Sequence, residues 1–271
     1  MRLLRLCCLA LPLFALTAYA DLILGSASSF AVLGGSAITN TGATVITGDL
    51  GVYPGTSITG FPPGIVNGTI HDGDAVAMQA QLDALTAINF LQGLPSNQNL
   101  SGQDLGGLML TPGVYTFNSS AQLTGALMLN FQGLSNQNFV FQIGSALTTA
   151  SASSVLLLNM GTNDNVYWAI GSSATLGTTT DFEGNIIAEQ SITLTTGATI
   201  DCGRALALNG AVTMDTNTIN NCAGVGGTTP EPGTIALVAT GGAIAAGANS
   251  PNFSFLGLFG AATAFCRRLK W

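Results

Sequence analysis

The sequence predicts a mainly β protein, a discontinuous three-sided β-solenoid (β-helix) with one long α-helix packed along one side. Three observations predict it. From Gly113 to Asn221 the chain repeats every 18 to 25 residues, and each repeat contains three short strand-like pieces. A helical pattern precedes these repeats, and strand-like sequence precedes the helix. Repeats of this length are typical of solenoids.

The first piece of each repeat is apolar on both sides of the strand, so we expect it to be covered on both faces. These pieces are VYTF (114–117), FVFQI (139–143), VYWAI (166–170), NIIAE (185–189) and RALAL (204–208).

The second piece alternates aliphatic residues with Ser or Thr. Such alternation places the aliphatic side chains inside and the hydroxyls in water. Thr175, Thr193 and Thr213 then fall in one register, with Thr148 on the same side. These pieces are SAQLT (120–124), SALTT (145–149), SATLG (173–177), SITLT (191–195) and GAVTM (210–214).

The third piece is mixed, with frequent Thr and Ser, and is a second candidate surface. Its examples are GALML (125–129), SASSVLLL (151–158), GTTTDF (177–182), TGATI (196–200) and DTNTI (215–219).

The segment DGDAVAMQAQLDALTAINFLQGLP predicts a helix at about residues 74–92. Asp74 can cap its start, and Gly93 with Pro95 ends it. Met78, Leu82, Leu85 and Phe90 fall broadly on one side, and we expect the helix to lie along the doubly apolar strands. Residues 28–55 have strand character and precede the helix, which predicts one early coil separated from the rest.

Composition excludes several classes of function. The chain has 271 residues, of which 47% are hydrophobic and only 7% charged, and its formal net charge is -7. Residues 21–229 contain one basic side chain, Arg204, against a dozen acids. Nucleic acid is therefore not an expected partner, because neutralising a phosphate backbone requires several cations.

Both ends of the chain resemble targeting segments. Residues 1–20 have Arg2 and Arg5, an apolar run and an Ala-Tyr-Ala end, which predicts a secretory signal removed after Ala20. Residues 226–271 begin with Pro-Glu-Pro, continue with apolar runs and close on basic residues. This tail resembles the PEP-CTERM sorting signal of Gram-negative bacteria, with a plain membrane anchor as the alternative.

These ends leave residues 21–225 as the folded domain, with transient membrane association through the tail. We expect a protein that is secreted or held on the outer cell surface. In an exported protein, Cys202 and Cys222, which flank the last coil, are expected to form a disulfide.

No residue pattern predicts an enzyme, a metal or a cofactor. Asp181, Glu183, Asp201 and Asp215 would need to gather on one face to cleave a polysaccharide. His71 lies beside Asp72 and Asp74, where capping of the helix is the simpler role. Arg204 is expected to bind backbone carbonyls or an acid such as Asp201.

Five ordered segments resemble the ice-binding protein family of cold-adapted bacteria, fungi, yeasts and diatoms. The resemblance implies a discontinuous β-solenoid of triangular cross-section with one helix beside it, and covers roughly residues 23–222. The segments are FAVLGGSAITNTGATVITGDLGVYPG (30–55), GFPPGIVNGTIH (60–71), LTPGVYTF (110–117), VYWAIGSSATLGTTTDFEGNI (166–186) and GRALALNGAVTMDTNTI (203–219).

The resemblance also implies ice binding by a flat solenoid side rich in Thr and Ser, in some members with a T-A/G-x-T/N motif. Residues 41–44 and 196–199 fit this motif, whereas 124–127 and 149–152 depart from it. A monomer that adsorbs to ice is therefore expected. The alternative is a cell-surface or biofilm-matrix adhesin that binds exopolysaccharide. Sugar-binding faces usually offer aromatic platforms, and here only Tyr53, Tyr115, Tyr167 and Trp168 are available, the last three on the doubly apolar strands.

Two surfaces compete for the ice contact. The second-piece side is preferred for its strict alternation, with Thr148, Ser173, Thr175, Ser191, Thr193, Thr195 and Thr213 as candidates. The third-piece side is the alternative, with Thr41, Thr44, Thr179, Thr196, Thr199, Thr216 and Thr218.

Overall fold

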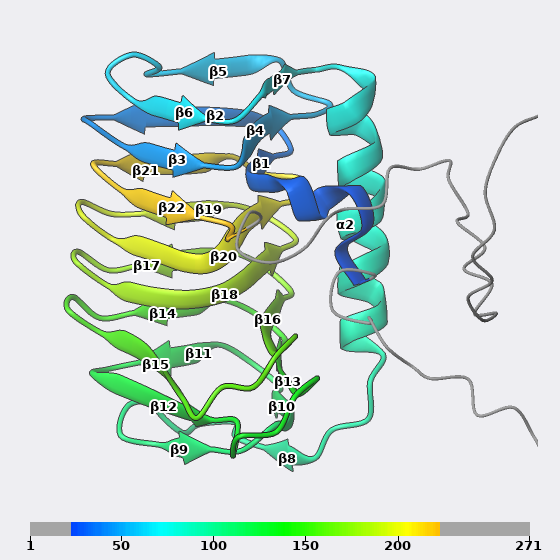
Figure 1. Ribbon diagram of the computed structural model, residues 1–271, viewed down its shortest axis with the longest axis vertical. Helices are drawn as coiled ribbons and strands as arrows, with labels where there is room; N and C mark the ends of the chain where they lie inside the picture. Colours follow the sequence, from blue (N-terminus) through cyan, green and yellow to red (C-terminus); the bar gives the residue numbers. More distant parts are fainter. Residues whose placement is uncertain (1–22, 223–271) are drawn as a thin grey trace, which may run out of the picture. The chain divides into compact units, whose positions relative to one another are not determined.

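The computed structural model describes residues 23–222 as a stack of β-coils with one helix standing along one side of the stack (Figure 1). The predicted signal and tail lie outside the described residues. The predicted mainly β solenoid with one long helix is confirmed.

The elements follow one another around the coils. Before the helix come η1 (Gly25–Ser29), β1 (Phe30–Gly34), β2 (Ala37–Thr41), β3 (Val45–Thr47), β4 (Asp49–Val52), β5 (Ser57–Thr59), β6 (Ile65–Asn67) and β7 (Ile70–Asp72). The helix α2 spans Ala75–Gln92. After it come β8 (Gln98–Asn99), β9 (Met109–Leu110), β10 (Gly113–Phe117), β11 (Ala121–Leu123), β12 (Ala126–Asn130), β13 (Asn138–Ile143), β14 (Leu147–Thr149) and β15 (Ser154–Leu158). The last strands are β16 (Asn165–Ile170), β17 (Ala174–Leu176), β18 (Asp181–Ala188), β19 (Ile192–Leu194), β20 (Thr199–Ala207), β21 (Val212–Asp215) and β22 (Thr218–Asn220).

The strands form two parallel sheets. The second pieces make a seven-stranded sheet in the order β11-β14-β17-β19-β21-β2-β5. The first and third sides belong to one 15-stranded sheet, because β18 and β20 run from the third side into the first. Their pairing shifts register between Glu183 and Asn185, where the chain changes sides.

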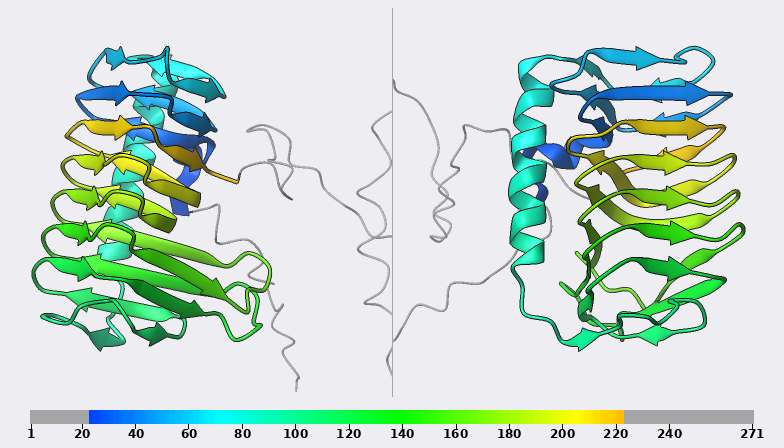
Figure 2. Two further views of the ribbon diagram at one scale, coloured as in Figure 1. Left: turned by 90° about the vertical axis from the view of Figure 1, so that its left-hand side faces the viewer. Right: turned by 180° about the vertical axis from the view of Figure 1, so that it is seen from behind.

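The last coil closes the stack against the first. Strand β21 lies between β19 and β2, and β22 lies between β20 and β3. Figure 2 shows the gold strand of the last coil directly beside the blue strand that precedes the helix. The early part contains two coils, β1-β2-β3 and β4-β5-β6, where the sequence predicted one.

The helix packs through a different face from the one predicted. Its cap is as expected, since the Asp74 carboxylate accepts hydrogen bonds from the backbone N–H groups of Val76 and Ala77. However, the large residues point to solvent; their exposed fractions are 37% for Met78, 52% for Leu82, 46% for Leu85 and 53% for Phe90.

Alanines form the buried face of the helix instead, together with Ile88 and Leu91. They are Ala77, Ala80, Ala84 and Ala87. Because alanine projects little beyond the helix backbone, the helix approaches the sheet closely, and Leu33, Tyr167 and Leu206 of the sheet fill the interface. Among residues 23–222, no helix is long and apolar enough to cross a membrane.

Two further predictions are confirmed. Cys202 and Cys222 are disulfide-bonded, with a Cα–Cα distance of 4.8 Å. The Arg204 guanidinium donates two hydrogen bonds to the Ser28 carbonyl, at 2.9 and 2.6 Å, and one to the Asn185 side chain at 2.7 Å. These bonds tie the last coil to the segment that precedes β1.

Candidate functional site

An unbroken row of threonines crosses the outer face of the seven-stranded sheet. Each member lies in register with the next on the neighbouring parallel strand. We call it the threonine row; in spatial order it is Thr148, Thr175, Thr193, Thr213, Thr39 and Thr59. Gln122 of β11 continues it at one end.

The alternation of residues within each strand directs the central threonine outward. Residues on either side of each central threonine point into the core; Ile192 and Leu194, for example, are almost fully buried beside Thr193. Thr175 and Thr193 are half-buried by their neighbours, while Thr148, Thr213, Thr39 and Thr59 are exposed. Asp215, at the end of β21, is the only charged residue in the seven strands.

Thr39 and Thr59 were not among the predicted site residues. Both occur in short alternating pieces, AITNT and SIT, that have the same character as the later units. The sequence could not place them in the row, because the long helix separates them from the repeats. Only the closure of the last coil onto β2 brings them into register.

The other preferred residues flank the row rather than extend it. Ser173 and Ser191 come immediately before β17 and β19, and the Ser173 hydroxyl accepts a hydrogen bond from the Ser191 backbone N–H. Thr195 follows β19, and its hydroxyl donates to the Leu176 carbonyl at 2.8 Å. Its hydroxyl is therefore already engaged by the protein.

The sequence prediction assigns Thr41 and Thr44 to the third side, and the structure places both elsewhere. Thr41 is the last residue of β2 in the seven-stranded sheet, opposite Asp215 of β21. Thr44 is completely buried: it donates to the Asn40 side chain at 2.5 Å and accepts from the Asn217 backbone N–H at 3.0 Å. Thr44 therefore stabilises the interior of the corner, the turn that leads from the seven-stranded sheet to the third side, and it cannot contact a ligand.

The T-A/G-x-T pattern marks this corner rather than a flat surface. Gly42 and Gly197, the second residues of the two matches, have φ values of 80° and 71°, a conformation that glycine adopts without steric cost. Thr179 and Thr216 occupy similar left-handed positions, each with φ of 54°. Together with Thr196 they are exposed at the turns between the two sides.

Only Thr199 and Thr218 of the alternative set lie on strands of the third side, paired with each other. Thr199 is half-buried and donates to the Asp181 carboxylate at 2.8 Å. The row of positions they share continues to Asp181 in one direction and to Val45 and Ile65 in the other. The third side is thus chemically mixed where the seven-stranded sheet is uniform.

Three of the four acids considered for catalysis gather on this third side. Glu183 pairs with Asp201, and Asp181 lies two residues before Glu183 on the same strand. Burial, then the charges of Asp201 and Asp181, raises the pKa of Glu183 to about 7. Asp215 lies apart from them, at the C-terminal end of β21 in the seven-stranded sheet, where it accepts a hydrogen bond from the Thr196 hydroxyl.

The remaining residues considered for a site, His71 and the aromatic side chains, have structural roles in the fold. His71 Nδ1 lies 2.8 Å from the Asp74 carboxylate beside the start of α2. The Ala77 N–H, followed by the hydrogen bond with His71, lowers the pKa of Asp74. Tyr115, Tyr167 and Trp168 are at most 5% exposed.

Residues 32–220 match the model of the family described as ice-binding-like. An ice-binding protein of Nostoc sp. (strain HG1) is 65% identical over 199 residues, which cover 73% of this chain and 74% of the relative. An ice-binding protein of Flavobacterium frigoris (strain PS1) is 33% identical over 217 residues, covering 73% and 76%.

Solved structures agree in fold. A crystal structure of an ice-binding protein from an Antarctic biological consortium aligns with a TM-score of 0.69 and 51% identity, over 73% of this chain and 89% of that one. The ice-binding protein of the ascomycete Antarctomyces psychrotrophicus aligns with a TM-score of 0.69 and 43% identity, covering 73% and 96%.

Proposed function

The chain belongs to the ice-binding-like family, and from this premise we propose that it is a secreted antifreeze protein that adsorbs to ice. We assign the contact to the outer face of the seven-stranded sheet. Adsorption there would inhibit ice growth and recrystallisation.

The unbroken threonine row is the observation that carries the assignment. Neighbouring strands of a sheet lie about 4.8 Å apart, and outward positions along one strand about 6.7 Å apart. The row therefore presents hydroxyl and methyl groups at regular intervals on a rigid support. Each hydroxyl can bond to ordered water, and each methyl must be surrounded by it.

The residue type also limits the entropy lost on adsorption. Threonine is branched at Cβ, so its χ1 angle is already restricted before ice is met. A charged side chain would retain its own hydration shell, and the six members of the row are neutral. On the third side, Asp181, Glu183 and Asp201 interrupt the surface, which favours the seven-stranded sheet.

The proposed organisation follows the predicted segments. Residues 1–20 direct export and are removed, residues 21–225 fold as the ice-binding domain, and residues 226–271 serve sorting with transient membrane association. The released domain acts as a monomer outside the cell. It carries out adsorption without a chemical step, and the proposal includes no cofactor or metal.

The adhesin alternative is not supported. Sugar-binding surfaces use exposed aromatic rings, yet Tyr115, Tyr167 and Trp168 are buried. Tyr53, the remaining tyrosine of the domain, packs against the interface between helix and sheet.

Growth of single ice crystals tests the proposal. Purified protein comprising residues 21–229 is added to a crystal held just below its melting point. We expect facets to appear and growth to stop within a measurable hysteresis gap. Round crystals that grow at the rate seen in buffer would contradict ice binding.

A further inference from the structure

Asp215 interrupts what would be a second row of threonines on the seven-stranded sheet. It lies two residues after Thr213 on β21, so its side chain leaves the sheet on the same face. The register places it directly opposite Thr41 of β2. On the other side it neighbours Thr195, because Thr193 pairs with Thr213 and each is followed two residues later by one of them. A charged group thus separates two threonines that lie beside the threonine row.

The Asp215 carboxylate also engages two hydroxyl groups at the adjoining corner. It accepts hydrogen bonds from Thr196 Oγ1 at 2.5 Å and from Thr216 Oγ1 at 3.0 Å. Both threonines are exposed. Since each hydroxyl has a single proton to donate, neither proton is offered to the water in front of the face.

An ionised carboxylate is a poor neighbour for ice. It only accepts hydrogen bonds, so every water beside it must turn a proton toward it, whereas water in ice both donates and accepts. Removing a charge from liquid water is also costly. Thr195 and Thr41 differ in this respect: each hydroxyl donates to a backbone carbonyl, and its lone pairs and methyl group remain for contact.

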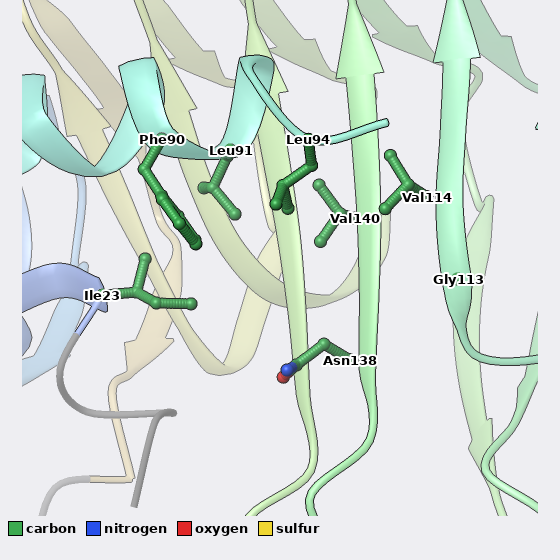
Figure 3. A pocket seen from close by; sticks show the side chains of 8 residues that line it. All are labelled: Ile23, Phe90, Leu91, Leu94, Gly113, Val114, Asn138 and Val140. Carbon is green, nitrogen blue, oxygen red and sulfur yellow. The ribbon is translucent and has the colours of Figure 1, made fainter. Parts of the chain in front are cut away.

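The hollow part of the surface does not compete with this face. A pocket of about 320 Å³ lies where the end of α2 meets β10 and β13, and its lining is apolar apart from Asn138 (Figure 3). It lies on the first side of the solenoid, whereas Asp215 lies in the seven-stranded sheet. Because the surface of an ice crystal cannot enter a pocket, the groups that limit the contact must lie on the flat sheet.

We propose that Asp215 determines the extent and the selectivity of the ice contact by keeping ice off the row of Thr195 and Thr41. The inference rests on the proposed ice-binding function. With the threonine row alone, ice has to match only the repeat of about 4.8 Å between strands. A second row would add the spacing of about 6.7 Å along the strands. One repeat fits every ice plane that contains it, whereas two repeats select among these planes.

Asp215→Thr tests the inference, because it places the residue type of the row between Thr195 and Thr41. We expect thermal hysteresis to rise about twofold, because the neutral contact widens from one row to two. Asp215→Asn removes the charge at nearly constant size and should raise hysteresis by a smaller factor. Asp72→Asn is the matched control: it removes the same charge from an exposed position on β7, outside the seven-stranded sheet, and should behave like the parent.

The ice planes that the protein adsorbs to give a second measurement. Parent and Asp215→Thr are each fused to a fluorescent protein and incorporated into a hemisphere of single-crystal ice. We expect the variant to label a narrower set of plane orientations than the parent. A purely structural role of Asp215 would not produce this change, and damage to the fold would not raise hysteresis.

Hysteresis in Asp215→Thr at or below the parent value, with Tm preserved, would overturn the inference. An equal rise in Asp72→Asn would also overturn it, because net charge would then be the cause. Asp215→Asn keeps the test decisive if Asp215→Thr does not fold. A parent protein that fails to halt ice growth would contradict the proposed function itself, so the two failures are distinguishable.

Discussion

Thr39 and Thr213 occupy the same register position on adjacent parallel strands, although one lies in the first coil and the other in the last. Their pairing joins the two parts of the threonine row where the stack closes. Figure 2 shows the gold strand of the last coil beside the blue strand of the early part at this seam. The proposed ice-binding face therefore exists only in the closed solenoid.

Substitutions on the two sides of this seam should not be additive. Thr39→Tyr and Thr213→Tyr each place a large ring on the flat face and should each reduce thermal hysteresis strongly. The double variant should lose little more, because one ring already holds the neighbouring surface away from ice and contacting sites couple. Nanolitre osmometry of the three variants measures this. Fully additive losses would show that the two residues act on separate surfaces.

The disulfide should stabilise the coil that carries Thr213. Cys202 and Cys222 are separated by 20 positions, and closing a loop of this length contributes roughly 3 kcal/mol. Cys202→Ser with Cys222→Ser should lower Tm by about 6 to 12 °C for a domain of this size. Calorimetry under non-reducing conditions measures the change. An unchanged Tm would indicate that the coil is already held by the hydrogen bonds that Arg204 donates to the Ser28 carbonyl and Asn221 donates to the Ser29 carbonyl.

Glu183 should make the domain less stable as pH rises. Its pKa is raised to about 7, so between about pH 4.5 and 7 the folded state binds more protons than the unfolded state. The free energy of unfolding should accordingly fall across this window and level off above it. Glu183→Gln should flatten the dependence and unfold at a higher urea concentration than the parent at pH 8. An identical pH dependence in both proteins would contradict the raised pKa.

Helix packing offers a matched pair of substitutions. Ala84→Leu adds a large side chain to the completely buried face and should cost about 1 to 3 kcal/mol. Leu82→Ala removes a side chain that is 52% exposed and should change stability by no more than about 0.5 kcal/mol. Urea unfolding of both variants measures the difference. If Leu82→Ala were the more destabilising of the two changes, the helix would pack through the face predicted from the sequence.

The sequence predicts the repeats well, because alternation within a short strand is a local property. Thr175, Thr193 and Thr213 share a register as expected, and Asp74 caps the helix at the predicted position. The disulfide also follows from its place at the ends of one coil. Each of these features depends on residues within one coil or on neighbouring coils of the repeat.

The errors have a common physical origin in tertiary contacts. The helix buries alanines because the sheet already supplies bulky side chains at the interface. The pattern of hydrophobic residues within the helix cannot show what the sheet supplies. Thr44 turns inward because Asn40 and Asn217 need partners inside the corner. Thr39 and Thr59 join the row only through a pairing between the two ends of the domain.

Replacement of Thr193 by Tyr tests the central assignment most directly. The side chain lies in the middle of the threonine row, and Thr218→Tyr places the same ring on an exposed strand of the third side. Both variants should keep Tm within about 2 °C, because each ring replaces a side chain outside the core, half-buried Thr193 or exposed Thr218. We expect Thr193→Tyr to lose most of the thermal hysteresis and Thr218→Tyr to keep it. Full hysteresis in Thr193→Tyr, with loss in Thr218→Tyr, would move the ice-binding site to the third side and contradict the account.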